Sequence, residues 1–539
     1  MRGSVAWLVV LCLATTAVPM RVGAEPAGSA LPGRNEPLPL QAGVLKLSLS
    51  EAVQLSIQRS LDVQLLRFDP YVAEENLGAA WGAYDPAFYG EGGYDRDEQP
   101  TANIFFGDSL LETTWGGEAG FRGLIPWVGG SYQAGYSGRE LITNSKIATL
   151  SPEFRTGFTA TLQVPLLRGL FWSDEWTLVR VSRIGVDASR DKFDSELMDQ
   201  VQNTEDAYWG LIAAQDSTRV AEKSLETAKA LLSQTQAQYE VGVVSRVEVV
   251  QAEAGVADRE FKLILTQAVE RNAQDALVDT VLGPYLEPES EITVEPTDRP
   301  DEMSVRAVSA AAATEHAMAR RPEIQLARKE IERRQVEARA TGNKRLPQLD
   351  AIASYGQAAL AGRFNPDCTF AGACSPPTGI GDVFPDANDS LLREGVSQQY
   401  SIQGILSIPL GNNTARHQHA KAEFELRRAE TSLLRLEQSI VSEIRRAARN
   451  LVSSVQGIEA AERAEAAAAE QLRAERVRLE HGESTPFDVL LREQDLVQAQ
   501  SQKIFAQKTY HNSITGLDRA QGTILERNQI VVEDAATLR

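Results

Sequence analysis

The stretch EVGVVSRVEVV, residues 240–250, recurs 240 positions later as EHGESTPFDVL, residues 480–490. In both copies an acidic residue and a glycine are followed by a second acidic residue, Glu248 in the first copy and Asp488 in the second. Each glycine lies between long runs of helical apolar spacing, and glycine accepts the positive φ that a turn between antiparallel helices requires. The two stretches therefore predict two helical hairpins of one kind.

Further pairs of stretches repeat in the same order along the chain. They are RSLDVQL with RRPEIQL, and LQVPL with LSIPL, at residues 59–65, 320–326, 162–166 and 406–410. A fixed order of repeated stretches indicates a duplication. We therefore predict a first structural repeat at residues 44–283 and a second at residues 302–525.

Each repeat is predicted to contain a helix, a strand region and a pair of long helices. The strand regions span residues 87–165 and 349–409, and the long helices span residues 176–283 and 413–525. Apolar residues of the first long helix keep the alternating three-and-four spacing of a coiled coil. At a rise of ~1.5 Å per residue, a helix from about Trp176 to Tyr239 is about 95 Å long. Such a helix forms a rod and does not fit inside a globular core.

The segments outside the repeats have other compositions. Residues 1–24 are typical of a signal peptide, with a basic start, a short apolar run and small residues before the expected cleavage site. Residues 25–43 and 284–301 are rich in proline and polar residues and are predicted to be linkers. Residues 526–539 form the predicted C-terminal tail.

The strand regions predict a β-barrel in a membrane. Of the 35 aromatic residues, 17 lie between residues 81 and 176, as in the aromatic girdles of such barrels. A soluble sandwich explains any one segment, but not the export signal and the rods together. Two strands per repeat give about four per chain, too few to close a barrel, whereas three copies would give twelve.

One region of the first repeat is longer than its counterpart. Residues 115–122 and 131–137 alternate like strands around a turn at residues 126–130. This segment is a candidate extra hairpin, so a contribution of six strands per chain stays open.

Composition excludes several classes of function. The formal net charge is −20 at pH 7 and no basic run occurs, which argues against a nucleic-acid partner. Three cysteines exclude a disulfide scaffold and a cysteine-rich metal site. We expect no catalytic residues, no cofactor and no metal, and therefore no enzyme. Two other kinds of protein are alternatives to a membrane barrel: a periplasmic coiled-coil adaptor or scaffold, and a secreted hydrolase on a coiled-coil stalk.

The chain resembles the TolC-like outer membrane efflux protein family. The resemblance rests on the opening LSLSEAV at residues 47–53, on Pro165 and Pro409 at strand ends, and on the paired turns at Gly242 and Gly482. It implies a homotrimer with a twelve-stranded barrel in the lipid of the cell outer membrane, continuous with a coiled-coil tunnel in the periplasm. It also implies a passive exit duct for efflux or type I secretion, whose partners are a periplasmic adaptor (membrane fusion) protein and an inner membrane pump.

The same resemblance implies roles for residues at the turns. Contacts to the adaptor are expected at Val241, Gly242, Val243, Ser245 and Gly482.

The channel constriction is expected at Asp488, with Glu248 in the first repeat. In the family a pair of aspartates forms a ring here, but the second position carries Leu491 in this chain. Asp488 also fits a simpler role at a helix start, where a carboxylate is favourable.

Cys368 and Cys374 lie in a loop rich in proline and glycine, between the strands of the second repeat. The duplication places this loop on the outer surface, in an oxidising compartment, and five residues separate the two cysteines. We therefore predict a disulfide bond between them.

Overall fold

The computed structural model describes most of the chain after the predicted linker. The described residues are 44–101, 109–282, 292–300, 309–369, 374–375, 378–392 and 397–530. The predicted signal peptide and the linker at residues 25–43 lie outside them.

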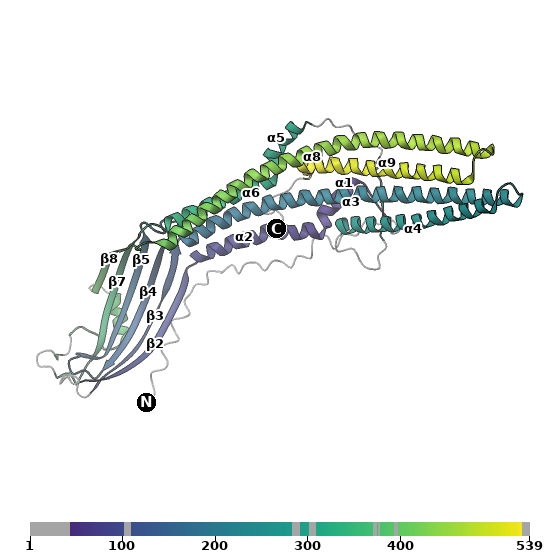
Figure 1. Ribbon diagram of the computed structural model, residues 1–539. Coiled ribbons are helices and arrows are strands. Elements are labelled where there is room, and N and C mark those ends of the chain that lie inside the picture. The colour runs from purple at the N-terminus through teal and green to yellow at the C-terminus, as the bar shows by residue number, and fades with distance from the viewer. Residues whose placement is uncertain are drawn as a thin grey trace, which may run out of the picture.

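Two long helical hairpins form a rod (Figure 1). The first consists of α3 (Asp174–Glu240) and α4 (Arg246–Leu282), and the second of α8 (Asn413–Glu480) and α9 (Pro486–Gln521). The 67 residues of α3 correspond to about 100 Å of helix. Helix α3 begins where the Ser173 side chain accepts a hydrogen bond from the Trp176 amide. The predicted rods are therefore present.

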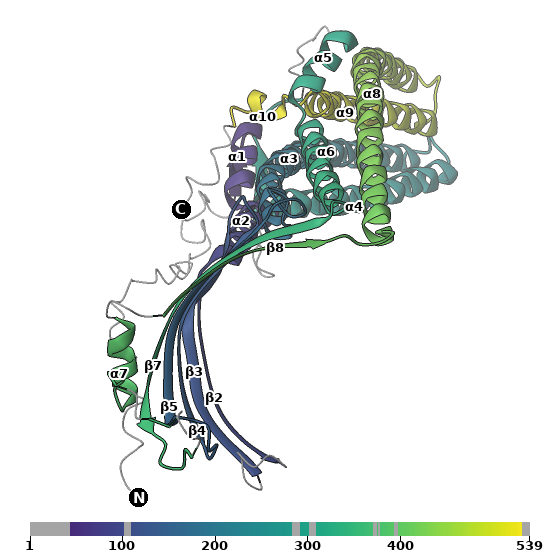
Figure 2. The same ribbon diagram turned by 90° about the vertical axis from the view of Figure 1, so that its left-hand side faces the viewer.

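A curved sheet adjoins one end of the rod (Figure 2). Its antiparallel strands occur in the order β2, β3, β4, β5, β7, β8. Their bounds are Ala87–Pro100, Ser109–Ile125, Gly130–Thr143, Leu150–Pro165, Gln348–Phe364 and Ser397–Ser407. The expectation of about four strands per chain is wrong, because the candidate hairpin at residues 115–137 forms β3 and β4.

The two faces of the sheet differ in chemistry, because paired residues on adjacent strands share a face. One row across all six strands carries mainly aromatic and small apolar side chains: Phe88, Phe121, Ala134, Ala160, Tyr355 and Tyr400. The neighbouring row is mostly polar: Ala87, Arg122, Gln133, Thr161, Ser354 and Ser401. The sheet therefore has one apolar face and one polar face.

Shorter helices lie along the rod. They are α1 (Leu49–Arg59), α2 (Leu61–Trp81), the 3-10 turn η2 (Gly82–Tyr84), α5 (Ala310–Arg320) and α6 (Pro322–Asn343). Helix α2 packs on α3, and α6 packs on both α3 and α8. Helix α1 begins with a capping box in which Ser48 and Glu51 exchange hydrogen bonds, as the sequence predicts.

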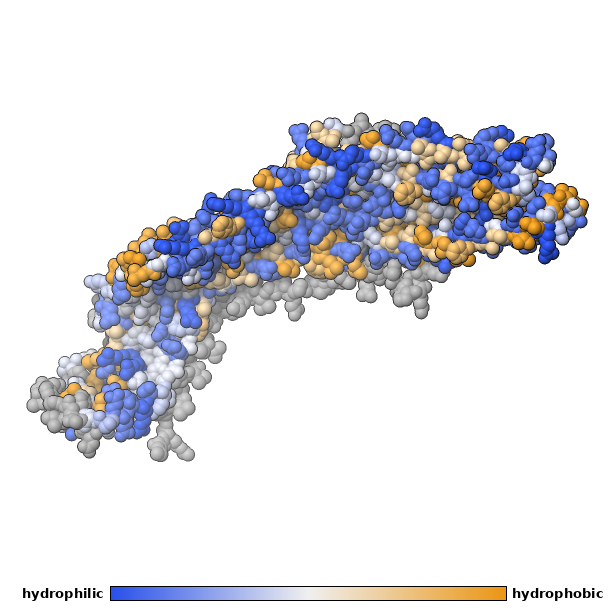
Figure 3. All heavy atoms as spheres, viewed as in Figure 1, coloured by the Kyte–Doolittle hydropathy of each residue, from blue (hydrophilic) through white to orange (hydrophobic). Residues whose placement is uncertain are grey.

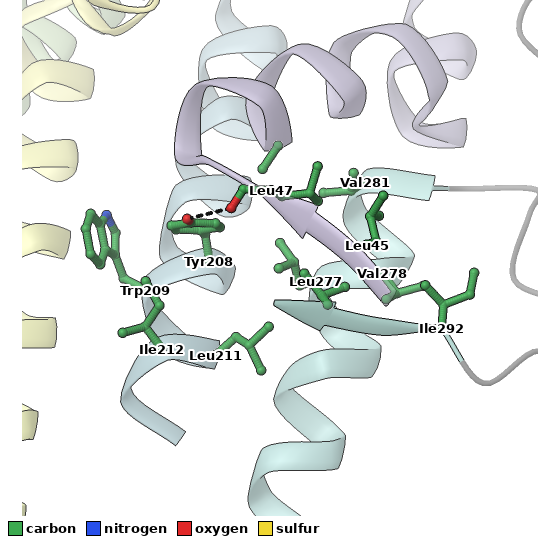
Figure 4. Packing of buried hydrophobic residues seen from close by; sticks show 12 residues of the cluster. Leu45, Leu47, Tyr208, Trp209, Leu211, Ile212, Leu277, Val278, Val281 and Ile292 are labelled. Atoms are coloured by element: carbon green, nitrogen blue, oxygen red, sulfur yellow. Dashed lines mark hydrogen bonds between the residues drawn. The ribbon is translucent and has the colours of Figure 1, made fainter. Parts of the chain in front are cut away.

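A two-stranded parallel sheet joins the start of the first repeat to the segment that follows this repeat. Strand β1 (Val44–Leu47) pairs with β6 (Thr293–Pro296). Leu45 and Leu47 are buried against Leu277, and the Tyr208 hydroxyl donates to the Leu47 carbonyl at 3.0 Å (Figure 4). Residues 293–296 are thus a paired strand within the segment 284–301, which was expected to be a linker.

Two small helices complete the fold. Helix α7 (Phe384–Leu391) packs on β5 and β7, where Phe384 meets Phe154. Helix α10 (Ile524–Arg527) packs on α3 and α9, and Arg527 contacts the buried carboxylate of Glu205. The first residues of the predicted tail are therefore anchored to the rod. In the described part of the chain, every helix is too short or too polar to cross a lipid bilayer.

Candidate functional site

The turn between α3 and α4 closes in a Schellman motif. Gly242 adopts a φ of 80°, and its amide donates to the Tyr239 carbonyl at 2.9 Å. The Val243 amide donates to the Gln238 carbonyl at 2.8 Å. These bonds satisfy the last carbonyls of α3, and glycine adopts this φ without the strain of a Cβ atom.

The turn between α8 and α9 repeats this geometry. Gly482 adopts a φ of 77°, and its amide donates to the Leu479 carbonyl at 3.0 Å. The Glu483 amide donates to the Arg478 carbonyl at 2.9 Å. The local structure of both turns therefore follows the repeat seen in the sequence.

The two turns lie at the end of the rod farthest from the sheet (Figure 1). Val241 and Val243 are 74% and 71% exposed, and apolar side chains are visible at this end in Figure 3. Gly242, Ser245 and Gly482 are also exposed. All five residues expected to contact an adaptor are thus accessible at one end of the molecule.

Asp488 caps the start of α9. The Thr485 hydroxyl accepts from the Asp488 amide at 3.2 Å, and the Asp488 carboxylate accepts from the Thr485 amide at 3.3 Å and from its hydroxyl at 2.7 Å. Hydrogen bonds from Thr485 lower the pKa of the Asp488 carboxyl. The simpler role of Asp488 at a helix start is therefore present in the structure.

Glu248 occupies the matching place in α4 with weaker contacts. The Ser245 hydroxyl reaches the Glu248 carboxylate at 3.4 Å, and the Glu248 amide donates to the Ser245 carbonyl at 3.2 Å. Thr485 and Ser245 are thus equivalent in position, but the complete capping box is formed in the second repeat.

A seam of buried residues joins the two hairpins close to these turns. Its apolar part consists of Ala228, Leu231, Leu472, Val489 and Leu490. Beside it, Arg259 of α4 donates to the Leu490 carbonyl of α9 at 3.1 Å, and its guanidinium lies 4.0 Å from the Glu493 carboxylate. Burial raises the pKa of Glu493, and the nearby Arg259 opposes that rise.

No local pattern in the sequence singles out Arg259 or Glu493. Both are buried, with 8% and 3% exposure, although charged residues on long coiled-coil helices usually face water. A weak local signal is Gly255, because a Cβ atom there would lie 3.0 Å from the Leu490 side chain. Glycine thus allows α4 and α9 to approach where the buried pair forms.

The remaining predicted residues lie at the opposite end of the molecule. Cys368 and Cys374 are joined by a disulfide bond in the loop after β7. The same loop is held by Asn365, whose side chain donates to the Ser145 and Ala148 carbonyls. The disulfide therefore belongs to the outer loops of the sheet and is separate from the turns.

Solved structures share this fold across nearly the whole chain. The Campylobacter jejuni CmeC outer membrane channel matches with a TM-score of 0.64 and 16% identity, over 91% of this chain and 88% of that one. The outer membrane protein VceC of Vibrio cholerae matches with a TM-score of 0.62 and 15% identity, over 88% and 96%. The open state of the Neisseria gonorrhoeae MtrE outer membrane channel matches with a TM-score of 0.58 and 14% identity, over 88% and 89%. The fold is therefore that of outer membrane channels.

The family follows from the sequence. The profile of the family described as outer membrane efflux protein matches residues 118–281 and 313–523, which make up 375 of the 539 residues. The chain belongs to the outer membrane efflux protein family. It is an efflux channel of the outer membrane, and its helical part lies in the periplasm. A comparison with curated proteins found no match.

Proposed function

We propose that three copies of this chain form a passive exit duct of a tripartite efflux or type I secretion system. In this proposal the six-stranded sheets together form a barrel in the outer membrane, and the helical hairpins form a periplasmic tunnel. An inner membrane pump supplies the energy, and a periplasmic adaptor joins the pump to the duct. We assign no catalysis and no cofactor to the chain.

A single copy of the chain leaves large apolar side chains uncovered. Helix α4 exposes a row of large apolar side chains, Phe261, Ile264, Leu265 and Val269, each at least 50% exposed. Helix α9 exposes Phe505 to 70%. Contiguous apolar surfaces of this kind mark protein contacts, and a ring of identical copies would cover them.

The sheet supports the same conclusion. Lipid cannot satisfy the amides and carbonyls of an open strand edge, and each unpaired group costs several kcal/mol. A six-stranded open sheet in a membrane therefore needs further strands, and other copies of the chain are the simplest source. Because the chain is a duplication, every copy carries two hairpin turns at the end of the rod farthest from the sheet.

The turns are the proposed meeting point with the adaptor. Val241 and Val243 present apolar surface on a rigid Schellman turn, so they can bind without a large loss of backbone entropy. The proposed constriction uses Asp488 and Glu248, whose carboxylates from three copies would surround the axis and favour cations. The proposed domain limits are those of the two repeats, at residues 44–283 and 302–525.

Substitution at the exposed turn tests the proposed function. Val243→Asp places a charge where apolar contact is expected, whereas Val243→Ala keeps an apolar side chain as the matched control. We expect Val243→Asp to abolish site-specific crosslinking of the turn to the adaptor, to stop export, and to leave outer membrane insertion and trimer mass unchanged. Unchanged crosslinking and export in Val243→Asp would reject docking at this turn, and recovery of the protein in the soluble periplasm would reject the duct.

A further inference from the structure

The hairpin β3–β4 is an integral part of the sheet. Its strand β3 pairs with β2 from Ala87 opposite Arg122 to Pro100 opposite Ser109, without a register shift. Its strand β4 pairs with β5 from Ser131 to Leu141. The hairpin therefore separates β2 from β5 along all of β2 and along residues 153–163 of β5.

The side chains of the hairpin continue both faces of the sheet. On the apolar face, Phe88 of β2 meets Phe121 of β3 with ring centroids 5.4 Å apart, and Tyr94 meets Trp115 at 4.7 Å. Cross-strand aromatic pairs stabilise strand pairing. The hairpin thus continues the apolar face of the neighbouring strands.

On the polar face, one side chain of β2 contacts both strands of the hairpin. The Tyr89 hydroxyl of β2 donates to the Glu118 carboxylate of β3 and accepts from the Gln133 amide of β4 at 2.9 Å. Gly135 leaves room for this phenol, because a Cβ atom there would lie 2.5 Å from its oxygen. Strands β2, β3 and β4 are therefore linked by side chains as well as by backbone.

The turn of the hairpin is fixed to the base of the helical rod. Trp127 lies against Trp176 of α3, with ring centroids 6.2 Å apart in an edge-to-face arrangement. Gly129 adopts a φ of 73°, and a Cβ atom there would lie 2.6 Å from the Gly169 carbonyl oxygen. These contacts place the turn beside the start of α3, at the level where the other strands join the helices.

The two outer strands of the sheet are open edges. Among the described residues, β2 and β8 each pair with one strand only. Tyr400 and Ile402 of β8 are 85% and 86% exposed, whereas Phe158 and Leu162 on the same face of β5 are 39% and 42% exposed. Strand β2 leaves the helices and β8 returns to them, so β8 of one copy and β2 of the next run antiparallel.

We propose that three copies close a barrel of eighteen strands, in which β8 of each copy pairs with β2 of the next copy. The inference rests on the trimer of the proposed function, and it changes the barrel from the twelve strands that the family resemblance implies. The added strands are β3 and β4 of each copy.

The stagger of the sheet determines the register of the new pairing. The row of paired residues that starts at Ala87 of β2 reaches β8 at Ser401, six residues before the last residue of that strand, Ser407. If the strand ends next to the helices lie at one level, Ser407 pairs with Ala87 of the next copy and Ser401 pairs with its Gly93.

This register satisfies two independent conditions. Ser401 and Gly93 both belong to the polar face, so neighbouring copies continue the same two faces. A stagger of six residues over six strands gives a strand tilt of about 35°, from ~3.4 Å per residue and ~4.8 Å between strands. Membrane barrels have tilts in this range.

Eighteen strands widen the outlet. At this tilt the barrel diameter between backbones is about 34 Å, compared with about 22 Å for twelve strands. The outer membrane part of the duct would then be wider than that of a twelve-stranded barrel, and selection by size would fall to the constriction at the turns.

A strand count in a density map tests the barrel. The full-length protein, purified from outer membranes into lipid nanodiscs, is imaged by cryo-electron microscopy. We expect a trimer with eighteen strands in the wall. A trimer with twelve strands, in which β2 pairs directly with β5 and residues 109–143 lie outside the wall, would overturn the inference and leave the proposed duct intact. A monomer would instead overturn the proposed function.

Disulfide crosslinking between copies tests the register. The variant Ser401→Cys with Gly93→Cys is made in a background with Cys368→Ser and Cys374→Ser, and Gly93 has open space for a side chain. We expect oxidation to link copies covalently. The control, Ser401→Cys with Thr114→Cys, places the second cysteine one strand further from the edge and should give no linked copies. Equal yields from both variants, or no linked copies from either, would overturn the proposed pairing.

Discussion

Arg259 of α4 and Glu493 of α9 face each other across the seam between the two hairpins, with 4.0 Å between guanidinium nitrogen and carboxylate oxygen. Both side chains are buried, and Arg259 also donates to the Leu490 carbonyl at 3.1 Å. A buried charge pair is costly to form but more costly to break, because one unpaired charge then remains inside the protein. The pair thus links the hairpins close to the turns.

We predict that Arg259→Met destabilises this end of the rod by about 3 kcal/mol, because Glu493 loses the buried guanidinium beside it. The double variant Arg259→Met with Glu493→Leu should recover most of the loss, because no buried charge remains. Resistance of the turns to protease and the midpoint of thermal unfolding report the effect. A double variant as unstable as the single one would show that the contacts of Arg259 with backbone carbonyls matter more than the charge pair.

A second ionic cluster predicts acid sensitivity. Glu323 of α6 accepts from Arg321 at 2.9 Å and from Arg519 at 2.7 Å. Burial would raise the pKa of Glu323, but the two guanidinium groups outweigh burial and lower it from 4.5 to about 2. A carboxyl with a lowered folded-state pKa stabilises the fold above its unfolded pKa, and this stability is lost as the pH falls through the folded-state pKa.

We therefore expect thermal stability to fall between about pH 4.5 and pH 2, with about 2 kcal/mol from Glu323 after allowance for solvent screening. Glu323→Gln should lower stability at pH 7 and flatten the acid dependence. Glu226→Gln is the matched control, because Glu226 pairs with Lys223 on the exposed surface of α3 and should have little effect. A Glu323→Gln variant with the acid profile of the native protein would contradict the assignment.

Two substitutions separate the two roles of Asp488. Thr485→Val removes the hydroxyl of the capping box but keeps the carboxylate, whereas Asp488→Asn removes the charge. If three Asp488 carboxylates surround the axis, Asp488→Asn lowers the cation preference of single channels in planar bilayers and Thr485→Val does not. If both variants keep the cation preference of the native channel and are only slightly less stable to heat, the role of Asp488 is limited to the helix start.

The disulfide predicts a local effect. Cys368 and Cys374 close a short loop, which removes little entropy from the unfolded chain. The double variant Cys368→Ser with Cys374→Ser should keep trimer mass and thermal midpoint, and should increase protease cleavage in the loop after β7. Alkylation of native protein without reductant should modify neither cysteine, and modification of both would contradict the bond.

Local sequence signals predicted much of this architecture. Gly242 and Gly482 predicted the hairpin turns because a positive φ favours glycine whatever the distant contacts are. The alternation of side chains on both sides of the turn at residues 126–130 indicates the extra hairpin. This pattern does not show whether the strands of the hairpin join the sheet. That decision depends on pairing with β2 and β5, which no local pattern specifies.

Contacts between distant segments were not predictable in the same way. Strand β6 pairs with β1 about 250 residues earlier, and a four-residue strand within a proline-rich segment has no period of its own. Arg259 and Glu493 are ordinary helix residues in sequence, and only the packing of one hairpin on the other buries them. Such sites follow from the assembled fold.

The mass of the protein in detergent shows directly whether three copies assemble. The protein is extracted from outer membranes, and the protein part of the particle is measured by light scattering with the detergent contribution subtracted. We expect three chains per particle, because one copy leaves sheet edges and helical apolar faces uncovered. A stable monomer that still conducts ions in a planar bilayer would contradict it.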